Sequence, residues 1–427
     1  MTDVDARPTA APARRHDGLL VILAVLLVAA NMRAALSGIG PVLDRVQAAT
    51  GMSATLAGVV TTLPVLSFAA VGGTSPALAR RWSLEHAIGA AVLLLGVAEF
   101  GRVLDGTWAL LVGTAAACAG IAVINVLLPV VIKQRFPHRL GSVTGLYTAS
   151  LNLFSALAAA TTAPLADRTD WRWALGCWGV LALLAAAVWQ PVLARHPVAV
   201  PAGVEAGRVE LAEGEPTTRP ATTDGPDPRQ GPDPTAAKPL VLWRHPIAWG
   251  VAVYFGMQSL LAYITMGWLP AIYRSAGVDS TTAGLLLALA IVIGVPVAYI
   301  VPTLAGRRPG QRAWAVGLTT CSAAGVAGLI VLPAQLAVVW AILIGLGQGC
   351  FPLALALFGF RTRDHRRTAA LSAFGQSVGY LLAVVGPLGV GVLHDLTGGW
   401  TVPLLLALCA MGVQAAAGMV AGRPVRL

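Results

Sequence analysis

Long apolar stretches separated by short polar segments repeat along almost the whole chain. A helix that crosses a membrane needs about 20 mostly apolar residues. Stretches of this length occur at residues 18–42, 54–77, 84–104, 108–132, 141–165, 172–193, 246–273, 281–304, 313–332, 335–360, 368–393 and 399–422. The pattern predicts an all-α membrane protein with twelve transmembrane helices.

One long polar segment divides the twelve stretches into two sets of six. Residues 194–245 are rich in Pro, Gly, Thr, Glu and Asp, a composition that cannot bury a core. We expect a disordered linker there, between a six-helix bundle at 18–193 and another at 246–422, with short tails at 1–17 and 423–427. No cleavage site follows the first apolar run, so we expect a retained helix rather than a signal peptide.

The composition supports a membrane protein. The chain is 56% hydrophobic and 11% charged, whereas a soluble domain carries about 25% charged residues. All five cysteines lie inside apolar stretches without a CxxC pair, so we expect small buried side chains. The sequence predicts no metal site and no cofactor.

The basic residues indicate the orientation of the chain. With the N-terminus in the cytoplasm, 23 of the 29 Lys and Arg residues fall in cytoplasmic segments and 5 in outer segments. This bias follows the rule that cytoplasmic loops are positively charged. It explains the net charge of +10 without a nucleic-acid partner. We therefore expect a multi-pass protein of the bacterial inner membrane with both termini and the linker in the cytoplasm.

The two halves of the chain resemble each other. At an offset of 226 residues, Gly, Thr, Pro and Arg recur in the same order; Gly58, Pro76 and Arg81 match Gly284, Pro302 and Arg307. Because six is an even number, both repeats enter the membrane from the same side. Such parallel repeats are related by a pseudo-two-fold axis along the membrane normal, as in the two halves of major facilitator proteins.

Several short motifs strengthen that resemblance. The chain resembles the cyanate and 2-nitroimidazole permease group of the major facilitator superfamily in NMRAAL (31–36), LPVL (63–66), NVLLP (125–129), WLP (268–270), GQG (347–349), QSVGY (376–380) and HDLTGGW (394–400). The loop after the second helix departs from the superfamily pattern, since Arg80 stands where an Asp is usual. The resemblance implies a transporter that works by alternating access, but it does not specify a substrate.

Arg33 is the one basic residue that this orientation assigns to neither a cytoplasmic nor an outer segment, and it lies deep inside a predicted span. An arginine at such a depth costs about 2.5–3.5 kcal/mol or more unless it faces water or a partner. The resemblance implies that its helix lines the central cavity, where the guanidinium could bind an anion through paired hydrogen bonds. The alternative is a structural pair with Glu99 or with helix carbonyls.

Glu99 is the acid that lies well inside a predicted span. It precedes Arg102 by three residues, so we expect a local ion pair on one helix face. The alternative is a carboxylate that couples transport to protons, which would add a coupling proton to the partners.

Polar side chains within the other spans are further candidates for substrate binding. Tyr254 with Gln258, and Gln376 with Tyr380, lie four residues apart and share a helix face. An amide beside a phenol can bind a small polar molecule, although hydrogen bonds between helices would also explain each residue. The remaining candidates are Asn125, Tyr147, Tyr263 and Gln348.

The basic pairs after the second and eighth helices complete the prediction. Arg80, Arg81, Arg307 and Arg308 lie where the superfamily closes its cytoplasmic gate, although topology alone would also place arginines there. We expect a monomeric permease, in contact with membrane lipid, for a small polar or anionic organic solute. A multidrug efflux protein of the same fold and a membrane-embedded enzyme remain alternatives. No GxxxxGK[ST] motif occurs, which argues against an ATP-driven pump.

Overall fold

The computed structural model describes residues 15–81, 83–136, 139–194, 242–363 and 365–427. Its first half contains α1 (Arg15–Ser37), α2 (Ile39–Thr50), α3 (Ala54–Arg81), α4 (Leu84–Gly101), α5 (Thr107–Arg135), α6 (Leu140–Arg168) and α7 (Trp171–Ala194). Its second half contains the short 3₁₀ helix η2 (Leu242–Arg244), α8 (Pro246–Ser275), α9 (Ser280–Ala305), α10 (Arg312–Val331), α11 (Ala337–Gly347), α12 (Cys350–Phe360), α13 (His365–Ala383), α14 (Val385–Thr397) and α15 (Thr401–Ala421).

The predicted all-helical membrane fold is confirmed. In the described part of the chain, eleven helices are long and apolar enough to cross a membrane, and Ala54–Phe68 of α3 forms a shorter apolar helix beside them. The first helix begins at Arg15 rather than at residue 18. Most of the predicted disordered linker and N-terminal tail lies outside the described residues.

Three of the predicted spans contain a helix break, and a proline accounts for each break. A proline ring clashes with the carbonyl group four residues earlier. Pro41 and Pro387 stand four residues after Ser37 and Ala383, the last residues of α1 and α13, and Pro352 stands five residues after the end of α11. The hydropathy pattern alone presents each of these three stretches as continuous. By contrast, α3, α5, α8 and α9 continue through Pro64, Pro129, Pro270 and Pro296.

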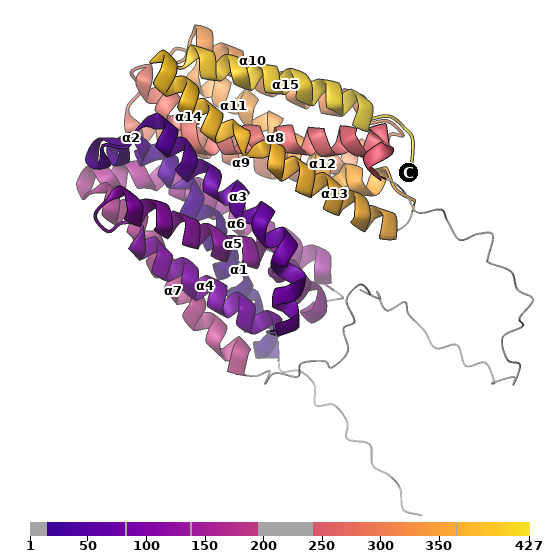
Figure 1. Ribbon diagram of the computed structural model, residues 1–427. Helices are drawn as coiled ribbons and strands as arrows, with labels where there is room; N and C mark the ends of the chain where they lie inside the picture. Colours follow the sequence, from indigo (N-terminus) through magenta and orange to yellow (C-terminus); the bar gives the residue numbers. More distant parts are fainter. Residues whose placement is uncertain (1–14, 82, 137–138, 195–241, 364) are drawn as a thin grey trace, which may run out of the picture.

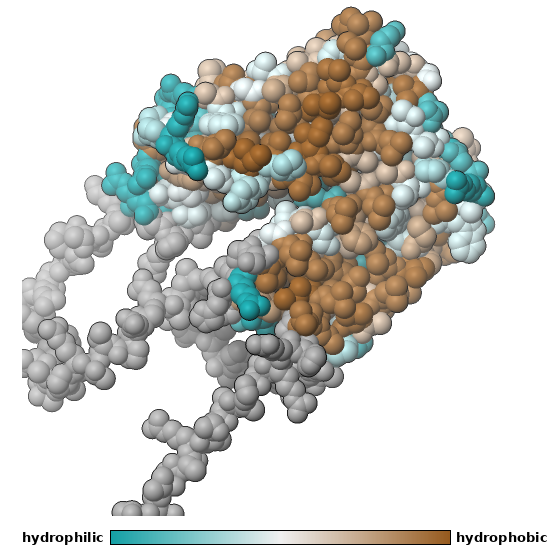
Figure 2. Space-filling model, turned by 180° about the vertical axis from the view of Figure 1, so that it is seen from behind, coloured by the Kyte–Doolittle hydropathy of each residue, from teal (hydrophilic) through white to brown (hydrophobic). Residues whose placement is uncertain are grey.

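The helices form two halves that meet at one end of the molecule and diverge toward the other (Figure 1). We call the end at which α7 ends and α8 begins the linker end, and the opposite end the closed end. The space-filling view shows a wedge-shaped recess between the halves that widens toward the linker end (Figure 2). Broad hydrophobic surfaces cover both halves in this view, as a lipid environment requires.

Exposed aromatic side chains lie near both ends of the spans. Trp108 and Trp173 are 78% and 73% exposed and lie on the first turns of α5 and α7, at the closed end. Tyr299 is 78% exposed and lies near the other end of α9. Tryptophan and tyrosine gather at membrane–water interfaces, so these residues are consistent with a bilayer whose normal runs from one end of the molecule to the other.

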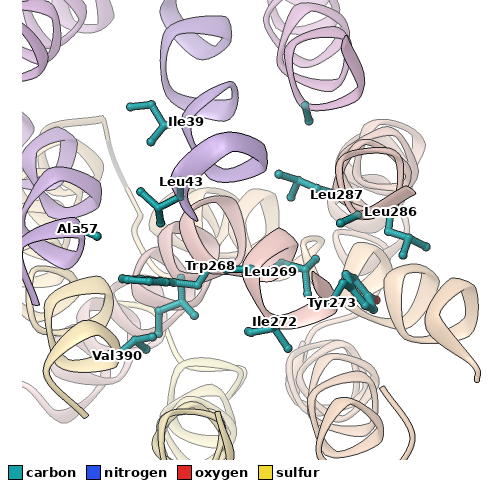
Figure 3. Close-up of a cluster of buried hydrophobic side chains, with 14 of the residues drawn as sticks. Ile39, Leu43, Ala57, Trp268, Leu269, Ile272, Tyr273, Leu286, Leu287 and Val390 are labelled. Carbon is teal, nitrogen blue, oxygen red and sulfur yellow. The ribbon is translucent and has the colours of Figure 1, made fainter. Parts of the chain in front are cut away.

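A cluster of buried apolar side chains joins the two halves at the closed end (Figure 3). Leu43 of α2 and Ala57 of α3 come from the first half, whereas Trp268 of α8 and Val390 of α14 come from the second. The indole Nε1 of Trp268 also donates a hydrogen bond of 3.2 Å to the Pro387 carbonyl, across from α8 to α14. Burial of these apolar surfaces stabilises closure at this end.

The internal repeat reappears as two equivalent contacts between the halves. A Cβ at Gly58 of α3 would stand 2.9 Å from the Pro387 carbonyl oxygen, and a Cβ at Gly284 of α9 would stand 2.5 Å from the Ala159 carbonyl oxygen of α6. These two glycines match at the offset of 226 residues. Each repeat therefore provides a glycine that lets one helix approach the other half closely.

Candidate functional site

Arg33 lies on α1 at the boundary between the two halves. Its side chain is half-buried, and its Nη1 atom lies 3.6 Å from the sulfur of Met266 on α8. No acidic side chain of the described residues forms an ion pair with Arg33. The expected alternative, a pair between Arg33 and Glu99, is therefore absent from this conformation. A guanidinium without a neutralising partner leaves a positive charge beside the interface of the halves.

Three tyrosines from three different helices lie within electrostatic range of this charge. The hydroxyl groups of Tyr147 on α6, Tyr263 on α8 and Tyr380 on α13 each interact with Arg33 through its charge. Tyr147 belongs to the first half, whereas Tyr263 and Tyr380 belong to the second. The fold thus brings four of the predicted binding residues together from both halves.

Aromatic packing holds Tyr380 in place. Its ring lies 5.3 Å from Phe255 in an edge-on arrangement and 5.8 Å from Phe68 of α3, measured between ring centroids. Phe255 lies on α8 of the same half, but Phe68 lies on the opposite half. Tyr380 therefore contacts both halves, and a relative movement of the halves would change its surroundings. Phe68 was not among the predicted residues, because its apolar side chain gave no signal distinct from lipid-facing positions.

A small cavity of about 20 Å³ lies beside the site. Tyr263, Met266 and Thr114 are among the residues that line it. This volume is close to the space that a single water molecule needs. The hydroxyls of Thr61 and Thr114 also lie at this cavity, and that of Thr114 is buried without a hydrogen-bond partner in the described residues.

A buried ion pair supports the helix that carries Arg33. Arg102 Nη2 lies 2.5 Å from Glu99 Oε2, and Arg102 Nη1 donates a hydrogen bond of 2.9 Å to the Ala35 carbonyl of α1. That carbonyl lies in the last turn before the break at Gly38, where helix carbonyls lack partners within the helix. The expected local pair of Glu99 with Arg102 is present. Glu99 and Arg102 are 1% and 0% exposed, so the carboxylate faces its own arginine and not the recess.

Two arginines assigned to polar segments by the sequence are in fact more buried than Arg33. Arg102 is 0% exposed and Arg361 is 2% exposed, whereas Arg33 is half-buried. Both were counted as loop residues because they flank apolar stretches. Their burial corrects the expectation that Arg33 is the one arginine removed from water.

Gln258 and Gln348 belong to a chain of amides in the second half. Gln414 Nε2 of α15 donates to Gln258 Oε1 at 2.8 Å, and Gln258 Nε2 donates to Gln348 Oε1 at 3.2 Å. Gln258 and Gln414 are 3% and 1% exposed. These hydrogen bonds link the three amides within the bundle, in line with the helix–helix alternative. Gln414 Oε1 is buried without a hydrogen-bond partner among the described residues. Gln414 was missed, although a lone amide in the apolar run of the last span was a visible signal.

The other predicted residues lie apart from this cluster. Tyr254 is 0% exposed and packs against Gly418 inside the second half. Gln376 donates to Ser372 on its own helix at 2.8 Å, and Asn125 of α5 is half-buried. Their binding roles stay predictions, and that of Tyr254 gains no support from its position.

The contacts that hold the halves together lie at the closed end. Arg45 of α2 donates a hydrogen bond of 3.0 Å to Ser280 of α9 in the other half, and it also forms an ion pair with Asp167 of its own half. Arg274 of α8 lies 2.7 Å from Asp44 and donates 2.8 Å to the Pro41 carbonyl of α2.

The predicted gating arginines are found at the opposite end. Arg307 and Arg308 are exposed at the linker end. The structure does not describe the side chains of Arg80 and Arg81, which end α3.

Comparisons with known proteins agree with this arrangement. Residues 22–387 match the family model of the Major Facilitator Superfamily. The chain is 33% identical to the 2-nitroimidazole transporter of Escherichia coli (strain K12), over 95% of this chain and 96% of that protein, and 31% identical to the cyanate transport protein CynX of the same organism, over 92% and 95%. The crystal structure of a bacterial homologue of the human lysosomal transporter Spinster superimposes with a TM-score of 0.73, at 14% identity, over 97% of this chain and 98% of that one.

Proposed function

The chain belongs to the major facilitator superfamily, and on that premise we propose that it moves a small polar or anionic organic solute across the bacterial inner membrane by alternating access. Family and relatives are transporters, so the protein is a transporter and not an enzyme. The observation that carries the proposal is Arg33, a charged side chain between the two halves with no acidic partner among the described residues.

The chemistry around Arg33 favours a small anion or a strongly dipolar molecule. A unit negative charge 4 Å from a guanidinium gains about 4 kcal/mol at an effective dielectric constant near 20, before the loss of hydration is counted. The phenols of Tyr147, Tyr263 and Tyr380 can each donate a hydrogen bond to a solute near Arg33. Two relatives transport cyanate and 2-nitroimidazole by name, and both molecules are small and either charged or dipolar.

We propose that the structure represents the inward-open state. The loop charges predict that the linker end faces the cytoplasm. The halves meet at the other end through Arg274 with Asp44 and through Arg45 with Ser280, and they diverge at the linker end (Figure 2). The outward-open state would then require these closed-end contacts to separate and the linker ends of the halves to approach each other.

Multidrug efflux is the second candidate, because apolar side chains such as Leu36, Ile39 and Val60 line the cavity beside the site. Arg33 argues against lipophilic cations, which it would repel. Coupling to protons stays open. Glu99 is enclosed with Arg102, so we assign Glu99 a positioning role for α1 and no coupling role.

Transport into liposomes tests the proposal. The full chain would be reconstituted, and uptake of radiolabelled cyanate, 2-nitroimidazole, benzoate and tetraphenylphosphonium would be compared with empty liposomes, with and without a pH gradient. We expect saturable uptake of at least one of the first three solutes and none of the cation. Uptake of the cation alone would favour efflux, and uptake of no solute would contradict the proposal.

A further inference from the structure

An arginine-lined pocket lies at the linker end of the second half, away from Arg33. Its volume is about 660 Å³, and none of its ten lining residues is acidic. Five of them are arginines, which come from the loop after α9, the loop after α12 and the C-terminal segment: Arg307, Arg308, Arg361, Arg363 and Arg426.

Hydrogen bonds fix the floor of this pocket. Arg361 Nε donates 2.7 Å to the Ala421 carbonyl, and Arg361 Nη2 donates to Gln311 Oε1. Gln311 in turn donates to the carbonyls of Ala305 and Arg308 at 3.1 and 2.7 Å. The Nη1 group of Arg361 has no hydrogen-bond partner in the part of the chain that the structure describes. A buried and rigid arginine therefore presents an unused donor group.

Five positive charges lie close together in the pocket. None of its arginines forms an ion pair with an acidic side chain among the described residues. Burial and the charge of Arg426 lower the pKa of Arg361, as expected for like charges held close together. A bound anion would relieve this repulsion and would accept the free hydrogen bonds.

The size and the charge of the pocket indicate the class of anion. Arginine binds phosphate through paired hydrogen bonds, and several arginines around one cavity favour a ligand with more than a single charge. The pocket also lies directly beyond the ends of α9 and α12, where lipid headgroups meet the protein. We infer that this pocket binds a phosphate group, which a lipid headgroup or a soluble phosphate compound could supply. This site would give Arg307 and Arg308 a role separate from gating.

Binding to the purified full chain tests the inference. Phosphatidylglycerol in mixed micelles tests the lipid source, with phosphatidylcholine, a zwitterion of no net charge, as its reference. Inorganic pyrophosphate tests the soluble source. The variant is Arg307→Gln/Arg426→Gln, which leaves the floor residue Arg361 intact. The control is Arg139→Gln/Arg423→Gln, because both arginines are exposed, neither lines the pocket and the loss of charge is the same. Equal thermal unfolding midpoints would show that both variants are folded.

We expect at least tenfold weaker binding in the pocket variant and less than a twofold change in the control. Such a loss for phosphatidylglycerol identifies a lipid site, and such a loss for pyrophosphate identifies a site for a soluble phosphate compound. The inference is overturned if neither probe binds more tightly than phosphatidylcholine, or if the control loses as much affinity as the pocket variant.

Discussion

The carboxylate of Asp395 on α14 accepts a hydrogen bond of 2.9 Å from the backbone amide of Ala54, the first residue of α3 in the opposite half. The next amide, that of Thr55, donates to the same carboxylate. Asp395 therefore caps a helix of the other half. Asp167 of α6 lies at the equivalent place and accepts a hydrogen bond of 3.5 Å from the Thr281 hydroxyl of α9. The pseudo-symmetry of the chain thus extends to the contacts that close one end.

Replacing Asp395 should weaken this closure. Loss of a helix cap costs about 1 kcal/mol, so Asp395→Ala should shift the equilibrium between the two states about fivefold toward opening of the closed end. Spin labels would be placed at Ala48 and Thr397 in a cysteine-free background, because both residues are exposed at that end on opposite halves. In Asp395→Ala a larger share of the molecules should show a long distance between the two labels. An unchanged distance distribution would mean that the cap does not hold the halves together.

Adding a single methyl group at Gly284 should also open the closed end, and more strongly than Asp395→Ala does. Its Cβ would stand 2.5 Å from the Ala159 carbonyl oxygen, closer than real contacts allow, so the halves cannot meet as they do here. We expect Gly284→Ala to populate mainly the long distance between the same two labels. Gly412→Ala is the matched control, because a Cβ at Gly412 meets no atom within 4 Å. Identical distributions for Gly284→Ala and Gly412→Ala would contradict the packing argument.

Arg102→Met should destabilise the whole protein. The substitution leaves the Glu99 carboxylate buried without a partner and frees the Ala35 carbonyl. Breaking a buried ion pair in this way costs about 3–5 kcal/mol. The double variant Glu99→Gln/Arg102→Met removes the charge and should recover a large part of the lost stability. Thermal unfolding in detergent measures the stability of both variants. A double variant no more stable than Arg102→Met would show that the unpaired charge of Glu99 does not cause the loss of stability.

The sequence predicted the helices and the repeat well because both depend on patterns within the chain. Span length and apolar composition are local properties, and the matched glycines lie at a constant offset. The breaks at Pro41, Pro352 and Pro387 were harder to predict, because other prolines in this chain, such as Pro129 and Pro270, leave their helices continuous.

The candidate site was predicted only in part, because burial depends on neighbouring helices. Arg33 and three tyrosines converge, but Tyr254 faces the interior of its own bundle although its spacing to Gln258 resembled that of a binding pair. Arg102 and Arg361 looked like loop residues, and only their distant partners, the Ala35 and Ala421 carbonyls, explain their burial. The arginine pocket assembles three segments that lie far apart in the sequence, so no local pattern could reveal it.

Equilibrium binding of the transported solute to Arg33 variants tests the central claim most directly. A charge-assisted hydrogen bond contributes about 1.5–3 kcal/mol, so Arg33→Gln should weaken binding by roughly 10-fold to 100-fold, and Arg33→Lys should lie between that variant and the unmodified protein. Asn31→Ala is the control, because Asn31 donates to the Leu27 carbonyl of its own helix and should change affinity less than threefold. If folded Arg33→Gln binds the solute as tightly as the unmodified protein, Arg33 is not the substrate anchor.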